Sequence, residues 1–416
     1  MHARIFFLFL GCLLMVDGVA QSWPGLFGPH RNGHVTHFQR PEQWPSKLQL
    51  AWELEVGAGY SAPIADQDGV FQFARMQDEE VLLKLDLASG KILWRSAASV
   101  PFKMGDGGEW HGKGPKSTPV LADRTLHTFS IHGTLSSWDR KTGKLLWQHA
   151  HPAFEGKSHP FWGATQSPLV TSENTVIVRF GNDDEGILKC FDADTGRVRW
   201  SLGPDAPCYA SPIIASLQGK KQLVEWNHEA LIGVDLQTGA MLWRYPLPHR
   251  GSNQNMPTPV LDAAHQSILV GGENRGIQSI QPILEQGKWS TQVRWHQRRV
   301  SLDMSSAVLM GSSLYGLSHR DSGQLFGLQT KDGSVSWLGA PRQGEHAHFL
   351  ALEEMLMVLS DRGQLSIYRP TTHGLETLAS YEVSSNPTWA PPLFWQDRIL
   401  IKDREKLLCW QLPSLR

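Results

Sequence analysis

The side chains best suited to chemistry are imidazoles and a carboxylate that lie in three separate loops. Glu109, Trp110 and His111 belong to a glycine-rich stretch, His159 lies in the next long loop, and His346 begins an apolar run with a second histidine two residues later. Imidazole and carboxylate groups bind zinc, so Glu109, His111, His159 and His346 form a candidate metal site. Their spacing matches no metal motif, and we therefore favour the interpretation that they are ordinary polar loop residues.

The same loops carry aromatic side chains that suit recognition of a partner. Trp110 precedes His111, and Phe161 and Trp162 follow His159. Large aromatic side chains often dominate the binding energy of protein interfaces, so these loops predict a binding face. The chain shows no glycine-rich phosphate loop followed by a helical pattern, no Ser-His-Asp order and no nucleophile elbow.

These loops connect copies of a nine-residue repeat, the clearest of which is Asp139 to Trp147, DRKTGKLLW. Two apolar runs joined by a Thr-Gly turn predict a β-hairpin, in which glycine adopts positive φ and aspartate accepts hydrogen bonds from the turn amides. The repeat positions are Asp86, Gly90 and Trp94, then Asp139, Gly143 and Trp147, then Asp192, Gly196 and Trp200, then Asp235, Gly239 and Trp243, and finally Gly333 and Trp337, with Gln329 in the aspartate position.

The spacing of the repeat predicts an all-β fold built as a propeller. With Trp52 and Trp295 included, the tryptophans recur at intervals of 42 to 53 residues, which is typical of four-stranded propeller blades. Seven complete units are followed by three C-terminal strands, while the orphan strand carrying Trp52 lies at the other end. We therefore expect an eight-bladed β-propeller of antiparallel blades over residues 48–416, a single domain whose last blade is closed by the N-terminal strand.

The remaining sequence sets the compartment and excludes some partners. Residues 1–20 read as a secretory signal peptide and residues 21–47 as an extended lead-in, so we expect export to the periplasm or the extracellular space. The net charge of -1 gives no general attraction for nucleic acid, and no segment after the leader is long and apolar enough to span a membrane. Of the three cysteines after the leader, Cys190 and Cys409 are expected to be buried thiols, and the protein is expected to be a monomer.

The repeats resemble the PQQ-like β-propeller family, and more distantly the propeller lipoprotein of the outer-membrane β-barrel assembly machinery. The quinoprotein dehydrogenases of this family use eight such blades to hold pyrroloquinoline quinone and Ca2+, and the alcohol-oxidising type carries a vicinal Cys-Cys pair. The resemblance therefore implies eight blades and raises the question of a quinone site. This chain has no adjacent cysteines. Asn253, Asn255 and Asp303 precede inner strands and are the oxygen donors that could face the axis, although no spacing singles them out.

Two functions from different classes follow from these observations. The first is an exported, non-catalytic propeller that binds an unidentified protein or peptide and holds no cofactor. The second is a PQQ- or metal-dependent oxidoreductase, which requires PQQ with Ca2+. The sequence favours the first, because the repeat covers nearly the whole mature chain without recognisable catalytic residues and because a repeat identifies a fold better than a function.

Overall fold

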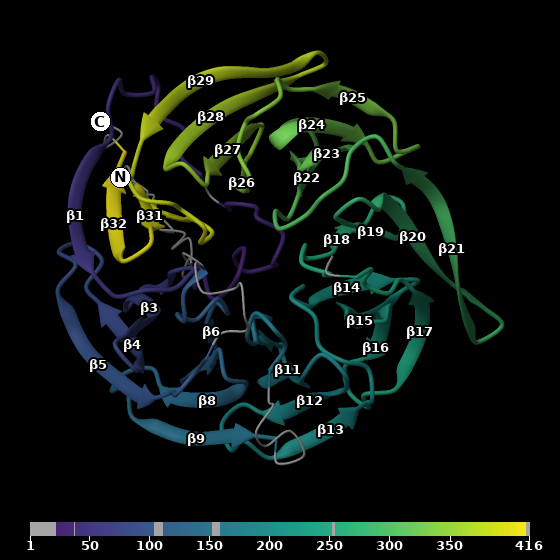
Figure 1. Ribbon diagram of the computed structural model, residues 1–416, viewed down its shortest axis with the longest axis horizontal. Helices are drawn as coiled ribbons and strands as arrows, with labels where there is room; N and C mark the ends of the chain where they lie inside the picture. Colours follow the sequence, from purple (N-terminus) through teal and green to yellow (C-terminus); the bar gives the residue numbers. More distant parts are fainter. Residues whose placement is uncertain (1–21, 37, 104–110, 152–158, 252–253, 413–416) are drawn as a thin grey trace, which may run out of the picture.

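The structure is a computed structural model that describes residues 22–36, 38–103, 111–151, 159–251 and 254–412. In these residues, eight four-stranded antiparallel sheets are arranged as blades around a central axis (Figure 1). One short 3-10 turn, η3 (Arg320–Ser322), interrupts the strands. Within the described ranges no helix has the length and apolar character needed to cross a bilayer. The predicted eight-bladed propeller is confirmed.

The blades follow one another along the chain, each from its inner to its outer strand. Blades 1 to 4 are β2 (Ile64–Asp66), β3 (Gly69–Met76), β4 (Glu79–Leu85) and β5 (Ile92–Ser99); β6 (Val120–Leu121), β7 (Thr125–Phe129), β8 (Thr134–Asp139) and β9 (Leu145–Ala150); β10 (Leu169–Val170), β11 (Thr175–Gly181), β12 (Gly186–Asp192) and β13 (Val198–Leu202); β14 (Ile213–Leu217), β15 (Lys220–Trp226), β16 (Ala230–Asp235) and β17 (Met241–Pro246). Blades 5 to 8 are β18 (Val260–Asp262), β19 (Ser267–Gly272), β20 (Gly276–Glu285) and β21 (Lys288–Gln297); β22 (Val308–Met310), β23 (Ser313–Ser318), β24 (Gln324–Gln329) and β25 (Val335–Leu338); β26 (Ala347–Leu352), β27 (Met355–Ser360), β28 (Gln364–Thr371) and β29 (Gly374–Glu382); β30 (Leu393–Trp395), β31 (Arg398–Lys402), β32 (Lys406–Gln411) and β1 (Gln49–Glu55).

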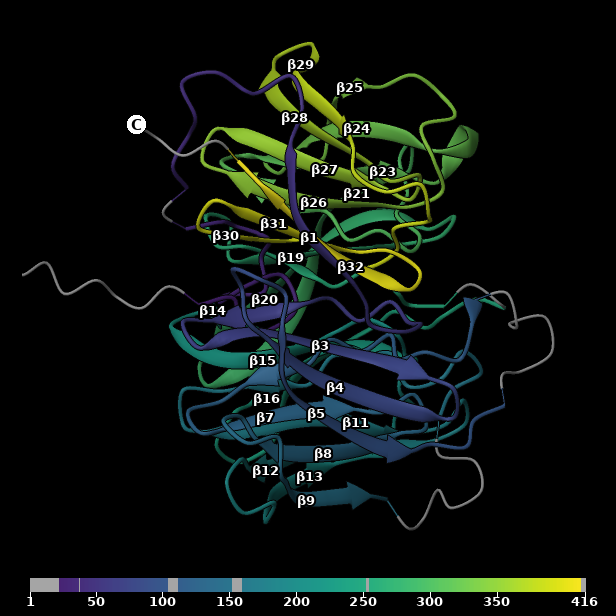
Figure 2. The same cartoon turned by 90° about the vertical axis from the view of Figure 1, so that its left-hand side faces the viewer.

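The eighth blade joins the two ends of the chain, as the sequence predicts. Strand β1 pairs antiparallel with β32, so that Gln49 lies opposite Gln411 and Trp52 opposite Cys409. Figure 2 shows the purple β1 running beside the yellow β32. This pairing leaves no blade incomplete and removes an open edge from the ring.

The conserved geometry of the repeat comes from a contact between neighbouring blades. The indole of Trp147 in blade 2 lies against Gly196 in the turn of blade 3, where an added Cβ would be 2.7 Å from the ring. Its Nε1 donates a hydrogen bond of 3.1 Å to the carbonyl of Ala193. Gly196 has φ +70°, and Asp192 accepts hydrogen bonds from the amide and hydroxyl of Thr195. The predicted turn is confirmed, and the tryptophan packs between the two blades.

The contact depends on the turn of the following blade. Trp52, Trp200 and Trp295 also donate to a turn carbonyl of the next blade, at 2.8–2.9 Å. Blade 5 lacks the Asp-Thr-Gly turn. Trp243 of the preceding blade 4 donates instead to the side chain of Gln222 within its own blade. Trp94 packs against Gly143 of blade 2 in the same way, but its Nε1 makes no hydrogen bond to that turn.

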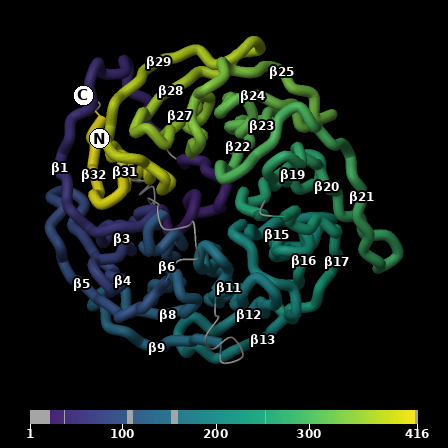
Figure 3. Tube along the Cα trace, viewed as in Figure 1, coloured from purple at the N-terminus to yellow at the C-terminus, as the bar shows by residue number. Residues whose placement is uncertain are grey.

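The lead-in forms a plug across the centre of the ring, a segment we define as residues 23–35. It begins beside β2, where Trp23 and Ala65 exchange backbone hydrogen bonds of 2.8 and 3.0 Å, and ends beside β26, where Val35 donates to Ala351 at 2.9 Å. Residues 25–32 fold into turns, so the expected extended lead-in is extended only in part. Figure 3 shows this purple segment crossing the middle of the ring.

Arg31 ties the plug to the blades on the far side of the axis. Its guanidinium donates to the carbonyl oxygens of Ser167, Pro168 and Pro212, which lie at the starts of blades 3 and 4. Burial lowers the pKa of Arg31 to about 9, so the side chain remains a cation at neutral pH. The plug therefore connects blades that are not neighbours in the ring, since its ends pair with blades 1 and 7 while Arg31 bonds to blades 3 and 4.

Candidate functional site

A cavity of about 240 Å3, which we call the cup, lies where the inner strands begin. Seven segments that lead into inner strands each contribute two lining residues that are two positions apart, because alternate side chains of an extended segment point the same way. We call the first residue of each pair the outer residue and the second the inner residue. The outer residues, together with the single residue before β2, are Tyr60, Lys116, Thr165, Tyr209, Met256, Met304, His346 and Trp389. Leu26 and Phe27 of the plug also line the cup.

The inner members of the pairs are mostly small hydroxyl residues that link neighbouring blades. The hydroxyl of Thr118 accepts the amide of Ala62 at 3.2 Å, Ser167 accepts the amide of Thr118 at 2.9 Å, and Ser211 accepts the amide of Ser167 at 3.0 Å. The amide of Thr258 donates in the same way to Ser306. These hydroxyls therefore link the openings of blades 1 to 4 to one another and the opening of blade 5 to that of blade 6.

Aromatic rings form much of the wall, and we call this set the collar: Tyr60, His111, Trp162, Tyr209 and Trp389. The centroids of Tyr60 and Trp389 are 6.0 Å apart, and His111 makes edge contacts with Trp389 at 5.9 Å and Trp162 at 5.0 Å. The hydroxyl of Tyr209 accepts the amide of Trp162 at 3.0 Å. The collar is therefore a connected set of rings that exposes part of its surface to the cup.

Two histidines of blade 7 stand beside the collar as a neutral pair. The Nε2 atoms of His346 and His348 are 2.9 Å apart, and the Nε2 of His348 is also 2.9 Å from the carbonyl of Trp389. His346 stacks on Trp389 with an interplanar angle of 10°. Burial lowers the pKa of His348 to about 4, and burial together with His348 lowers the pKa of His346 further. Both rings are therefore uncharged at pH 7.

Lys116 brings a positive charge to the wall of the cup. Its Nζ donates to the carbonyl of Trp162 at 3.2 Å, and burial lowers its pKa to about 8, with Glu80 acting in the opposite direction. Glu80 lies behind the wall, where its carboxyl accepts the amide of Ile131 at 3.0 Å and where burial raises its pKa to about 7. Among the described ion pairs, none joins Lys116 to a carboxylate.

The structure brings together some of the residues proposed from the sequence and separates others. His111, Trp162 and His346 line the cup, whereas His159 packs on Phe102 with a centroid distance of 4.7 Å and does not reach it. Phe161 is exposed next to Trp162. Glu109 and Trp110 lie outside the described residues. Within the described ranges, no three His, Cys, Asp or Glu residues are grouped so that they could hold a metal ion.

Of the oxygen donors considered for calcium, Asn253 lies outside the described residues, and neither Asn255 nor Asp303 lines the cup. Asn255 is buried, and its amide is already bonded to Arg275 at 2.5 Å and to the carbonyl of Asn227 at 2.7 Å. Asp303 lies near Glu273, and burial together with Glu273 raises its pKa to about 6. The described lining of the cup contains neither aspartate nor glutamate. Since Ca2+ takes six to eight oxygen ligands, the described residues do not fit the calcium-bound quinone of the quinoprotein dehydrogenases.

The lining residues that the sequence did not propose include Tyr60, Lys116, Tyr209 and Trp389. The signal that would have found three of them is positional, because Lys116, Tyr209 and Trp389 each stand two residues before the small or proline residue that opens a blade. Tyr60 occupies the same position relative to Ala62. The inner residue marks the blade start, and the outer one carries the side chain that differs from blade to blade.

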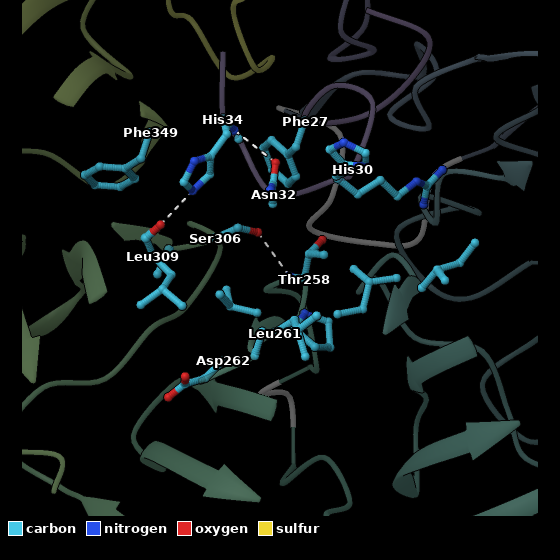
Figure 4. Close-up of a pocket in the computed structure, with 18 of the residues that line it drawn as sticks. Phe27, His30, Asn32, His34, Thr258, Leu261, Asp262, Ser306, Leu309 and Phe349 are labelled. Carbon is cyan, nitrogen blue, oxygen red and sulfur yellow. Dashed lines mark hydrogen bonds between the residues drawn. The ribbon is translucent and has the colours of Figure 1, made fainter. Parts of the chain in front are cut away.

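A second cavity, of about 610 Å3, lies on the other side of the plug (Figure 4). The plug contributes Phe27, His30 and His34 to its wall, and the facing wall includes Leu261 and Asp262 of β18. The Nε2 of His34 lies 2.7 Å from the carbonyl of Leu309. Phe27 lines both cavities, so its ring lies between the cup and this rear pocket.

Comparison with curated proteins finds relatives of two kinds. The chain is 25% identical over 238 residues to the outer membrane protein assembly factor BamB of Alteromonas naphthalenivorans, a match that covers 53% of this chain and 54% of that protein. It is 26% identical over 169 residues to the dehydrogenase subunit of the quinone-type alcohol dehydrogenase of Gluconacetobacter polyoxogenes, covering 37% of this chain and 21% of that protein. The chain thus spans from about a fifth to about half of the length of these relatives.

Solved structures of both kinds share the fold. BamB of Moraxella catarrhalis superimposes with a TM-score of 0.59 at 14% identity, covering 89% of this chain and 99% of that one. The quinohemoprotein alcohol dehydrogenase of Comamonas testosteroni gives a TM-score of 0.66 at 13% identity, covering 95% of this chain and 81% of that one. At these identities the likeness concerns the fold alone.

The family model covers a larger continuous part of the chain than these pairwise sequence matches. The PQQ_2 model, described as outer membrane protein assembly factor BamB, matches residues 77–338, which extend from blade 1 through blade 6. Because this match spans more than half of the sequence, the chain belongs to the PQQ_2, BamB-like family of β-propellers.

Proposed function

We propose that this protein is an exported, non-catalytic propeller that binds a protein or peptide partner at the mouth of the cup. The observation that carries the proposal is the collar, which offers partly exposed rings around an open cavity with the plug behind it. Aromatic side chains at the centre of a concave site are the residues that most often dominate protein interfaces. Export is supported by the leader-like sequence of residues 1–20 and by the similarity to outer membrane assembly factors.

A photo-crosslinking amino acid at the exposed position 161 tests the proposal directly. Phe161 lies beside Trp162 at the rim, so the probe should capture a defined partner in the cell that makes the protein. The matched control is the same probe at Leu146, which is equally exposed but lies on the outer strand of blade 2. Capture at position 161 should disappear when Trp110 and Trp162 are both replaced by alanine. Equal capture from both probe positions, or capture that survives the double replacement, contradicts the proposal.

A quinoprotein-like oxidoreductase is the second candidate, favoured by the sequence similarity to quinone-type alcohol dehydrogenases. It predicts that purified residues 21–416 bind pyrroloquinoline quinone with Ca2+ and melt at a higher temperature, since a ligand of the folded state stabilises it. A saturable absorbance change with a raised melting temperature would favour this candidate over the first. The absence of acidic residues from the described lining of the cup is why we rank it second.

A further inference from the structure

The charge, the rings and the shape of the cup together specify what it can hold. Among the described lining residues, Lys116 is the one that carries a formal charge at neutral pH. The described lining contains no other lysine or arginine and no aspartate or glutamate, and burial keeps its histidines neutral. Its one hydrogen bond among the described residues is to a backbone carbonyl. Lys116 is half-buried and has no ion-pair partner among the described residues, so an anion that enters the cup can accept a charge-assisted hydrogen bond from it.

The collar adds a second requirement, because an anion alone would leave its rings in contact with water. The faces and edges of Tyr60, Trp162 and Trp389 offer apolar surface within the same cavity that contains Lys116. Aromatic rings pack well against other rings in edge and offset arrangements. The ligand that satisfies both requirements carries an aromatic ring and a carboxylate close together.

Size and shape limit how that ligand can enter. The cup, at about 240 Å3, is smaller than the roughly 300–1,000 Å3 of pockets that hold drug-sized molecules, so it holds about one residue. Leu26 and Phe27 of the plug line the cup, and the plug crosses the centre of the ring, so we expect the plug to stop a chain from running onward through the axis. A polypeptide can therefore place a side chain or a chain end in the cup, but it cannot thread through.

We propose that the cup binds the C-terminal aromatic residue of a polypeptide, with the ring on the collar and the α-carboxylate on Lys116. This inference rests on the proposed function and names the part of the partner that is recognised. The terminus is preferred over an internal aromatic residue because only the terminus presents ring and carboxylate on the same residue. Glu80 behind the wall competes with the ligand for Lys116, since its charge also acts on that lysine.

Binding of short labelled peptides to the purified full chain tests the proposal. A peptide ending in phenylalanine as a free acid should bind at least tenfold more tightly than the same peptide with a C-terminal amide, and tenfold more tightly than the free acid ending in alanine. Equal affinity of acid and amide overturns the proposal. N-acetyl-phenylalanine binding as tightly as the peptide would also overturn it, by showing that the ligand is a free aromatic acid.

Three variants assign the effect to the lysine. Lys116→Met keeps the aliphatic stem but removes the charge, so acid and amide should bind equally. Lys113→Met, on the same loop but exposed, is the matched control and should retain the preference for the acid. Glu80→Gln should strengthen binding of the acid, because it removes the competing carboxylate. An unchanged preference in Lys116→Met overturns the proposal.

A pH profile of the unaltered protein keeps the test valid if Lys116→Met does not fold. The groups that face Lys116 are Glu80 and His111; the pKa of His111 is lowered to about 4 and that of Glu80 raised to about 7, both chiefly by burial. Between pH 7.5 and 9.5, any change in binding affinity should therefore come mainly from deprotonation of Lys116, whose pKa is lowered to about 8. Affinity for the acid should fall several-fold over this range while that for the amide stays constant; parallel profiles contradict the proposal. Partner capture at position 161 without any preference for the acid would overturn this inference alone, and loss of both would overturn the proposed function as well.

Discussion

The indole of Trp147 packs on Gly196 of the next blade, which makes that glycine necessary for two reasons at once. Its φ of +70° is unfavourable for other residues, and a Cβ would lie 2.7 Å from the ring. Gly219 has a similar φ of +73° but nothing within 4 Å of an added Cβ. We therefore expect Gly219→Ala to lower the free energy of unfolding by about 1–2 kcal/mol, the cost of the left-handed conformation.

Gly196→Ala should lower the free energy of unfolding by clearly more than Gly219→Ala, by roughly 1–3 kcal/mol beyond it, because the indole must shift as well. Urea denaturation of the two variants under the same conditions measures the difference. Equal losses would mean that the tryptophan contact adds nothing and that the glycine serves only its own turn.

Arg179 and Glu225 form a buried ion pair between blades 3 and 4. Their side chains are 1% and 0% exposed, with two contacts of 2.8 and 2.6 Å. Glu225→Gln removes the carboxylate that pairs directly with the guanidinium, so we expect a loss of about 3–5 kcal/mol in the free energy of unfolding. The exposed pair Arg369 and Glu376 is the control, and Glu376→Gln should change it by less than about 1 kcal/mol.

Replacing Arg179 and Glu225 together by apolar residues of similar volume should recover most of the stability that Glu225→Gln loses, because no charge remains buried. Chemical denaturation of the single and double variants gives both values. A double variant as unstable as the single one would show that the pair is needed for packing rather than for its charges.

Arg31 should hold the plug in place more than it holds the ring together. Arg31→Met removes the donors to three backbone carbonyls, and we expect it to lower the free energy of unfolding by about 2 kcal/mol and to expose residues 23–35 to limited proteolysis. Arg40→Met, in the same lead-in but exposed, should leave both measurements unchanged. Identical cleavage patterns for the two variants would contradict this role.

His127 should make stability depend on pH. Its ring is fully buried, with Nε2 3.0 Å from the Thr125 hydroxyl, and burial lowers its pKa to about 3 from an unfolded value near 6.5. Below pH 6.5 the unfolded chain binds a proton that the folded chain does not, so the folded state loses stability as the pH falls from 6.5 toward 3. In this range His127→Gln should reduce the slope of the unfolding free energy against pH by up to about 1.4 kcal/mol per pH unit. The control His373→Gln, at an exposed position, should leave the slope unchanged.

The sequence predicts the ring well and the cup poorly, for a physical reason. The Asp-Thr-Gly-Trp pattern is local, so each copy reveals a hairpin, and its period reveals the number of blades. The cup is assembled from eight points on the chain that meet only at the axis, so Lys116, Tyr209 and Trp389 have no local neighbours in common. Arg31 shows the same limit, since its carbonyl partners lie 136 to 181 residues away.

The pairing of β1 with β32 also sets a waiting time during synthesis. Glu53 and Lys406, which form an ion pair of 2.9 Å across this junction, are 353 residues apart. At roughly 5–20 residues per second, the ribosome needs about 20–70 s to make the chain between them. For that time β1 is a bare strand with unsatisfied backbone groups, open to pairing with other chains. The closing strand therefore waits longer for its partner than any strand that pairs within its own hairpin.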